Sequence, residues 1–283
     1  MTASAETRPL SQEPLARLTD GPGPRPVTRA SDRASVWGLV WTLIRTDFKA
    51  RYHGTPVGFL WALLKPTAMF LVLVGVFSLI FHNEPNYKLK LIIGLFLWNF
   101  FSEATTTGMG SLAAKGFLVS KARFPRWILV VTSIANALIT LLVFAGVVTT
   151  FLVITGRGPS VAALGAFAFY IVCLTTITIG LSLGTSVLFL RFRDLNQIWD
   201  MTTQAGFFLA PIVYPLGVIP ERYHLYLYLW PPTPAIEFSR LAMVEGVLPS
   251  PVAHICLGLM AIGILAVGAV LFRRYGPRAA EYV

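Results

Sequence analysis

Six long apolar stretches alternate with short polar segments between residues 57 and 272. A helix that crosses a bilayer needs about 20 apolar residues. By that measure the pattern predicts six transmembrane helices, at about residues 57–81, 89–114, 127–155, 161–190, 199–218 and 252–272. Lys65 and Pro66 interrupt the first stretch, so this helix either begins near Pro66 or is kinked there. The pattern therefore predicts an all-α integral membrane protein.

A different periodicity precedes the first predicted span. Between residues 36 and 52, apolar side chains recur at steps of three and four, which places them on one helical face: Val36, Leu39, Val40, Leu43, Ile44 and Phe48. Charged side chains lie largely off this stripe. The profile predicts an amphipathic helix in the membrane interface over residues 34–56, with a helix packed on another part of the protein as the alternative.

Two regions outside the spans have distinct compositions. Residues 1–33 are rich in proline and carry no apolar signal-peptide core, which predicts a flexible cytoplasmic tail ahead of a membrane domain at residues 57–283. Residues 219–251 combine Tyr and Trp side chains with three closely spaced prolines. This second region predicts a pair of short re-entrant helices that dip into the outer leaflet without crossing it.

Composition supports a membrane location. Of 283 residues, 55% are hydrophobic and only 13% are charged, against about 25% charged in a typical soluble domain. The two cysteines, Cys173 and Cys256, fall in apolar stretches and predict neither a disulfide framework nor a metal site. These proportions argue against a cytosolic enzyme and against a disordered chain.

The distribution of basic residues predicts the orientation. With six spans, 18 Lys and Arg residues fall on the side that carries both termini, and five fall on the other side. Because cytoplasmic loops carry the excess of Lys and Arg, both termini are expected in the cytoplasm, in a multi-pass protein of the cytoplasmic (plasma) membrane. The net charge of +10 is then expected to serve topology and contact with anionic headgroups rather than nucleic acid.

Candidate chemistry inside the membrane is sparse. Glu103 is the one acid well inside a predicted span, and Asn99, Ser102, Thr106 and Thr107 lie near enough along the helix to hydrogen-bond it. Two interpretations stay open for Glu103, a polar position on a permeation path or a polar contact between helices. The chain has no GxxxxGK[ST] phosphate loop, no HExxH and no GxSxG motif, so neither ATP binding nor an enzyme is predicted.

Aromatic residues are numerous in the first, second and fifth predicted spans. Flat apolar rings can stack against the C–H faces of sugars, although lipid-facing bulk explains most aromatics in membrane proteins. The candidate substrate path, with Glu103 included, comprises Phe59, Trp61, Phe70, Phe77, Phe81, Trp98, Glu103, Phe207, Phe208 and Tyr214. Gly180 and Gly184 have the GxxxG spacing of close helix contacts, which alone is weak evidence for a dimer face.

Four segments together give the chain a family resemblance over about residues 36–283. It resembles the membrane subunits of ABC-2-type polysaccharide exporters, which move O-antigen, teichoic acid and related glycans such as galactan. The resemblance is carried in order by DFKARYHGTPVGFLWALLKP (47–66), FLVSKARFPR (117–126), RFRDLNQI (191–198) and PPTPAIEFSR (231–240). This chain has Thr233-Pro234 where the family more often has Asn-Pro.

The resemblance implies a homodimer of six-span subunits that forms a channel, with an ATP-binding subunit docked on each copy from the cytoplasm. ATP and Mg²⁺ would then reside on that partner, and this chain would hold no cofactor. By position, ATPase coupling is implied for Lys115, Phe117, Lys121, Arg123, Phe124, Pro125, Arg126, Arg193 and Asp194. An outer gate is implied for Tyr223, Tyr226, Trp230, Pro234, Glu237 and Arg240.

The function expected from sequence is ATP-driven export of a lipid-linked polysaccharide through this permease. Arg outnumbers Lys by 17 to six, which fits a GC-rich coding bias and, among the family's substrates, favours an actinobacterial lipid-linked galactan. Three other hypotheses remain: an ABC-2 exporter of drugs or lipids, an intramembrane enzyme that acts on a sugar lipid through Glu103, and a structural scaffold.

Overall fold

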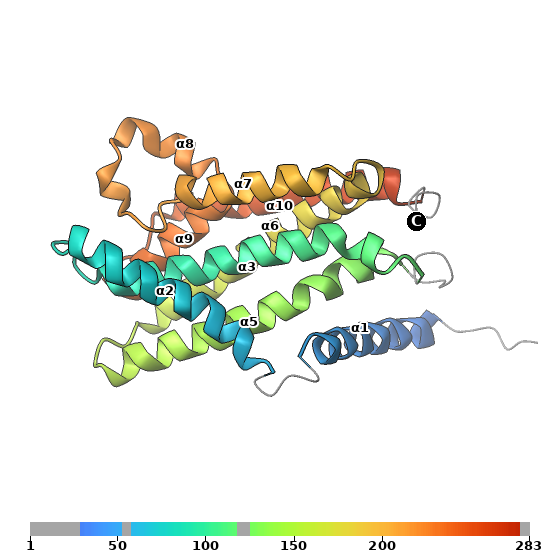
Figure 1. Ribbon diagram of the computed structural model, residues 1–283, viewed down its shortest axis with the longest axis horizontal. Coiled ribbons are helices and arrows are strands. Elements are labelled where there is room, and N and C mark those ends of the chain that lie inside the picture. The colour runs from blue at the N-terminus through green and yellow to red at the C-terminus, as the bar shows by residue number, and fades with distance from the viewer. Residues whose placement is uncertain (1–28, 53–57, 118–124, 278–283) are drawn as a thin grey trace, which may run out of the picture. The chain divides into compact units, whose positions relative to one another are not determined.

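The computed structural model describes residues 29–52, 58–117 and 125–277, and most of these residues are helical (Figure 1). Within these ranges the structure contains no strand, as the sequence pattern predicts. The chain forms two compact units, Met1–Trp41 and Thr42–Val283. Helix α1 (Arg29–Tyr52) begins in the first unit and ends in the second. The tail predicted at residues 1–33 lies largely outside the described residues.

Five long helices form the second unit. They are α2 (Leu60–Ile80), α3 (Tyr87–Ala114), α5 (Trp127–Ile154), α6 (Val161–Arg191) and α10 (Pro251–Tyr275). Each coincides closely with a predicted apolar stretch, because continuous apolar runs of this length favour helix over any other structure in lipid. By length and composition, α2, α5, α6 and α10 qualify as membrane-spanning helices in the described part of the chain.

Polar side chains define where two of these helices begin. The Ser160 hydroxyl accepts a hydrogen bond from the Ala163 amide at 3.1 Å at the start of α6, and Ser250 accepts one from Ala253 at 3.3 Å at the start of α10. Both are N-cap bonds, which satisfy amides that have no partner inside the helix.

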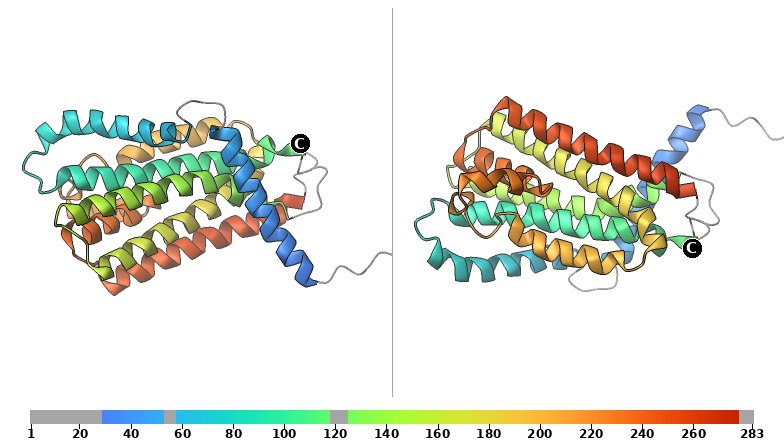
Figure 2. Two further views of the ribbon diagram at one scale, coloured as in Figure 1. Left: turned by 90° about the horizontal axis from the view of Figure 1, so that it is seen from below. Right: turned by 90° about the horizontal axis from the view of Figure 1, so that it is seen from above.

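Helix α3 lies at the centre of the unit, where it packs against α5, α6 and α2 (Figure 2). Helix α6 in turn packs along α10, and glycines make this approach possible. A Cβ atom on Gly180 would lie 2.7 Å from backbone atoms of Ile264 and Leu265, closer than real Cβ contacts allow. The Gly180–Gly184 spacing therefore serves packing within this chain rather than identifying a face between subunits.

Helix α2 resolves the ambiguity about Pro66. The helix begins at Leu60 and continues through Pro66, which lies in its second turn. Leu73 is its one fully buried residue, so most of its apolar surface faces away from the rest of the chain. An apolar helix with so little buried surface is suited to contact with lipid or with another protein.

The fifth predicted span is shorter than expected. Helix α7 (Leu195–Leu209) ends well before the predicted limit at residue 218, and non-helical backbone comes after it. Pro211 and Pro215 explain the difference, because proline lacks the amide that a continuing helix requires. At about 1.5 Å per residue, its 15 residues extend about 22 Å, less than a hydrocarbon core of about 30 Å.

Short helices fill the segment between α7 and α10. After the short 3₁₀ turns Leu216–Val218 and Glu221–Tyr223 come α8 (His224–Tyr228), α9 (Pro232–Arg240) and a π-helical turn at Leu241–Glu245. The short helices predicted for this region are therefore present. We call the end of the second unit that carries this segment and the α2–α3 connection the distal end. The opposite, proximal end carries residues 191–194 and the end of α10.

Candidate functional site

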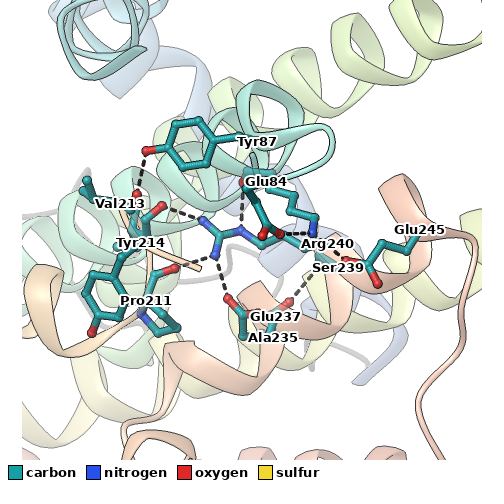
Figure 3. Close-up of polar contacts among 12 residues, drawn as sticks. Glu84, Tyr87, Pro211, Val213, Tyr214, Ala235, Glu237, Ser239, Arg240 and Glu245 are labelled. Carbon is teal, nitrogen blue, oxygen red and sulfur yellow. Dashed lines mark hydrogen bonds and ion pairs between the residues drawn. The ribbon is translucent and has the colours of Figure 1, made fainter. Parts of the chain in front are cut away.

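The distal end is organised by Arg240, the last residue of α9. Its side chain is only 5% exposed and its guanidinium reaches three elements (Figure 3). It donates to the carbonyls of Lys90 on α3 at 2.8 Å, Pro211 at 2.5 Å and Ile212 at 2.7 Å. It also pairs with the Glu237 carboxylate at 2.6 Å, one turn earlier on α9. A buried charge of this kind is tolerated because it is both paired and hydrogen-bonded.

This contact explains how the chain leaves helix α7 without exposing unpaired backbone. The carbonyls of Pro211 and Ile212 lie just beyond the helix end and accept from Arg240, and the next carbonyl, of Val213, accepts from the buried Tyr87 hydroxyl at 2.6 Å. Buried carbonyls without a partner are costly. Three consecutive carbonyls of the broken helix are therefore satisfied by two side chains from other elements.

Gly94 makes room for the Arg240 guanidinium against α3. A Cβ atom at this position would overlap the guanidinium, approaching its central carbon to 2.8 Å. The backbone of Gly94 is ordinary helix, so the requirement is for space rather than for an unusual conformation. Neither Gly94 nor Tyr87 was predicted from sequence.

A cavity of about 550 Å³ lies beside this network. Its walls come from the α2–α3 connection, the start of α3, residues 212–218 and the α9 region. Lys90 lies in its wall and pairs with two carboxylates, Glu84 and Glu245, each at 2.7 Å. Five charged side chains therefore line one cavity, and of these only Glu237 and Arg240 were predicted from sequence.

The predicted gate residues divide by burial. Pro234, Glu237 and Arg240 are buried, whereas Tyr223 and Tyr226 are exposed. Trp230 is partly buried and packs on Trp98 and Phe101 of α3, with ring centroids 6.5 and 6.1 Å apart. The structure therefore brings four of the six predicted gate residues into contact with the body of the unit.

The predicted substrate-path aromatics gather in three places. Phe59 contacts the rings of Phe48 and Tyr52, and Phe77 stacks on Phe81, which contacts Tyr87. Trp98 contacts Phe207, which contacts Phe208. The remaining members are Trp61, which is exposed, Phe70, which is half-buried, and Tyr214, whose hydroxyl donates to the Phe208 carbonyl at 2.7 Å. One continuous aromatic lining is not formed within this single chain.

Glu103 has a partner that sequence proximity did not suggest. Its carboxylate pairs with the Arg51 guanidinium of α1 at 2.5 Å, and the two side chains are 39% and 37% exposed. Burial works against the charge of Arg51, but the neighbouring Glu103 and Tyr52 outweigh it and raise the pKa of Arg51. The Thr107 hydroxyl, which was expected to hydrogen-bond the Glu103 carboxylate, donates instead to the backbone carbonyl of Glu103. Of the two interpretations of Glu103, this geometry favours the contact between helices.

A second ion pair joins the same two helices. Lys115, directly after α3, pairs with Asp47 of α1 at 2.5 Å and also donates to the Ser133 hydroxyl of α5 at 3.1 Å. The apolar side chain of Leu43 packs against the core beside it. The last turns of α1 are therefore held on α3 by two ion pairs and by apolar contact.

The remaining predicted coupling residues lie at the proximal end where the structure describes them. Arg126 donates to the carbonyls of Gly276 at 2.5 Å and Pro277 at 3.0 Å, which attaches the start of α5 to the end of α10. Phe117, Pro125, Arg193 and Asp194 are exposed. The other three, Lys121, Arg123 and Phe124, lie outside the described residues.

The contacts of this site are hydrogen bonds and ion pairs. No group of three or more His, Cys, Asp or Glu side chains within residues 29–52, 58–117 and 125–277 is placed to bind a metal ion.

Comparison with known proteins identifies relatives over most of the chain. A family model described as ABC-2 type transporter matches residues 38–244. The chain is 28% identical to an O-antigen export system permease protein, RfbA, of Klebsiella pneumoniae, and 27% identical to an RfbA of Myxococcus xanthus; each match covers 87% of this chain and 95% of the relative. It is 26% identical to the polysialic acid transport protein KpsM of Escherichia coli, over 83% of this chain and 92% of KpsM.

Proposed function

Because the chain belongs to the ABC-2 type transporter family, we propose that it is the channel-forming membrane subunit of an ATP-driven exporter of a lipid-linked polysaccharide. The observation that carries the proposal is that relatives matching at least 83% of the chain are named for O-antigen export or polysialic acid transport. O-antigen, teichoic-acid and galactan polymers are the substrate types considered. The chain itself is a transport subunit and not an enzyme.

The proposal assigns the energy source to another chain. A separate ATP-binding subunit, in two copies, binds ATP and Mg²⁺ and docks from the cytoplasm on a homodimer of this protein. Residues 115–126 and 191–197 form the docking surface, and this chain holds no cofactor. The basic character of these segments supports the assignment, since four of residues 115–126 are Lys or Arg.

The proposal also assigns six crossings. The described helices α2, α3, α5, α6 and α10 each exceed 20 residues. In the proposed topology α7 and the backbone after it complete the sixth crossing. Both termini then lie in the cytoplasm and the distal end faces the exterior, where the segment 219–246 forms re-entrant gate helices. The hydrogen bonds from Arg240 and Tyr87 support this assignment, because non-helical backbone at membrane depth requires protein partners.

The decisive experiment is reconstitution of the chain with and without an ATP-binding subunit. The purified chain is placed in proteoliposomes with a lipid-linked glycan, alone and together with a candidate ATP-binding subunit. We expect ATP-dependent movement of the glycan when both chains are present and none with either alone. If the chain alone chemically processes a lipid-linked sugar, the transporter proposal is wrong.

Topology can be tested on two exposed aromatic residues. Single cysteines replace Phe117, which is 69% exposed, or Tyr226, which is 66% exposed, in a background that carries Cys256→Ser because Cys256 is itself exposed. In intact cells we expect an impermeant maleimide to label the Tyr226→Cys variant, and the Phe117→Cys variant only after permeabilisation. Labelling of Phe117→Cys from outside would overturn the proposed orientation.

The docking surface is tested by one charge reversal. Arg123→Glu is expected to weaken co-purification of the ATP-binding subunit and to abolish export, because it places a negative charge in a basic segment. Arg222→Glu, which reverses the charge of an exposed arginine of the distal segment, is the matched control for docking and should leave co-purification unchanged. Full co-purification with Arg123→Glu would contradict the assignment of residues 115–126.

A further inference from the structure

The distal cavity has the size and the wall composition of a ligand site. Its volume of about 550 Å³ falls within the range of about 300–1,000 Å³ that is usual for small-molecule sites. Aromatic rings of Phe81, Tyr87 and Tyr228 line it, and the first two are in contact with centroids 5.4 Å apart. Aliphatic side chains such as Leu91 complete the apolar part. The cavity therefore combines flat apolar surface with the charged groups described above.

The hydrogen-bond donors of this cavity are largely committed to the protein itself. A guanidinium has five N–H donors, and Arg240 directs four of them to Lys90, Pro211, Ile212 and Glu237. An ammonium has three donors, and Lys90 directs two of them to Glu84 and Glu245. The two cations are therefore poorly placed to serve an incoming anion.

The carboxylates that line the cavity can accept further hydrogen bonds. Glu84, Glu237 and Glu245 each bond a cation through one carboxylate oxygen, whereas a carboxylate offers about four acceptor sites. Three carboxylates face two cations in the cavity wall, so its formal charge is also on the acidic side. Such a cavity is matched to a ligand that donates hydrogen bonds and carries no negative charge.

We infer that the distal cavity binds an uncharged saccharide unit, whose hydroxyl groups donate to Glu84 and Glu245 and whose C–H face packs on the aromatic wall. The inference rests on the proposed function and narrows it: the exported glycan is neutral rather than acidic. Acidic sugars are disfavoured because their carboxylates would face carboxylates whose cations are already paired. Neutral sugars meet no such repulsion.

A second cavity, on the other side of Phe81, Glu84 and Tyr87, carries the opposite charge. It is lined by Lys88 and Arg157, and Arg157 donates to the Asn86 side chain at 2.8 Å. Both basic side chains are exposed, so water and salt screen them effectively. Glu84 lines both cavities, and screening keeps its attraction to these two side chains weak; neither of them is among the residues that line the first cavity.

Saccharide binding tests the inference on the full chain in lipid nanodiscs. The probes are three neutral trisaccharides (galactotriose, mannotriose and maltotriose) and the anionic sialyllactose, with affinity measured by saturation-transfer NMR titration. We expect at least one neutral probe to bind and sialyllactose to bind more weakly. In the Glu84→Gln/Glu245→Gln variant, loss of charge-assisted bonds should weaken the neutral probe about tenfold. Glu221→Gln, outside the cavity lining, is the matched control.

A second variant keeps the ion pairs intact. Gly217 lines the cavity and has open space where a Cβ would lie, so Gly217→Trp should fill the cavity without disturbing the fold, and Gly217→Ala serves as its control. We expect Gly217→Trp to abolish binding of the neutral probe and Gly217→Ala to retain it.

The outcomes separate this inference from the proposed function. If reconstituted export succeeds but no neutral probe binds, or if sialyllactose binds as tightly, the inference is wrong and the exporter stands. Binding that survives Gly217→Trp unchanged would likewise place the saccharide elsewhere. If neutral probes bind and Gly217→Trp blocks them, the cavity is confirmed as a saccharide site even where export with the chosen ATPase fails.

Discussion

Arginine side chains contact both halves of helix α3, and their ion pairs differ in burial. At the distal end the Arg240–Glu237 pair is 5% and 10% exposed, and Arg240 also satisfies three backbone carbonyls. Toward the proximal end the Arg51–Glu103 pair is 37% and 39% exposed. Exposed pairs contribute about 0–1 kcal/mol, whereas breaking a buried pair costs about 3–5 kcal/mol. The distal contacts therefore contribute strongly to stability, whereas breaking the Arg51–Glu103 pair should cost little.

The largest expected effect comes from removing the distal guanidinium. Arg240→Ala leaves Glu237 as an uncompensated buried charge, so we expect a loss of about 3–5 kcal/mol in the free energy of unfolding. Arg240→Lys should recover little of it, because an ammonium lacks the planar fork that reaches several carbonyls. Unfolding in detergent, followed by circular dichroism, measures both variants. Wild-type stability in Arg240→Ala would remove the distinction between the two ends.

Gly94 provides the next largest effect, with a control on the same helix. Gly94→Ala places a methyl group against the Arg240 guanidinium, so we expect a loss of about 1–3 kcal/mol from overpacking. Gly110→Ala meets open space and should be neutral or stabilising by up to about 1 kcal/mol, because alanine favours helix. The same unfolding assay compares the pair. Equal stability of the two variants would show that Arg240 moves aside readily.

Tyr87→Phe removes one hydroxyl and so measures the contribution of a single hydrogen bond at the distal end. The Val213 carbonyl loses its donor, and the expected loss is about 1 kcal/mol, typical of a single neutral hydrogen bond. Since the ring stays in place, the contact with Phe81 should persist. A loss as large as that of Arg240→Ala would mean that Tyr87 and Arg240 share the anchoring role equally.

The smallest effect is expected at the proximal end. In a double-mutant cycle of Arg51→Ala and Glu103→Ala, the coupling free energy should stay below about 1 kcal/mol, as for other exposed pairs. Raising the salt concentration should reduce it further, because exposed charges are screened. A coupling above about 3 kcal/mol would show that this pair is as structural as the distal one.

Sequence reasoning located the helices well and their long-range contacts poorly. Apolar runs fix where a helix is favoured, so five predicted spans agree with α2, α3, α5, α6 and α10 to within a few residues. Helix α7 ends at Leu209, short of residue 218, because Pro211 follows inside an otherwise apolar run. Hydropathy averages over such a run and does not register a single missing amide.

The residues of the distal site were predicted only in part: Glu237 and Arg240 were named, whereas Tyr87, Lys90 and Gly94 were not. Arg240 was assigned to a gate from a resemblance, yet the three backbone carbonyls that it bonds lie 28 to 150 residues away in sequence. Glu103 was matched with nearby Asn, Ser and Thr side chains, whereas its partner is 52 residues away. One feature of the sequence does point to the role of Arg240: an arginine in a proline-rich apolar segment predicts a buried charge with a polar partner. It does not identify that partner.

The order of charges at the proximal end has a further consequence. Helix α1 presents Asp47 and then Arg51; Arg51 pairs with Glu103 of α3, and Asp47 pairs with Lys115 directly after α3. Asp47 and Arg51 are about one turn apart on α1, so a shift of α1 by one turn along its own axis would bring Asp47 toward Glu103 or Arg51 toward Lys115, and like charges would repel. The order of charges therefore favours one register of α1 against α3 and disfavours a register that is shifted by one turn of α1.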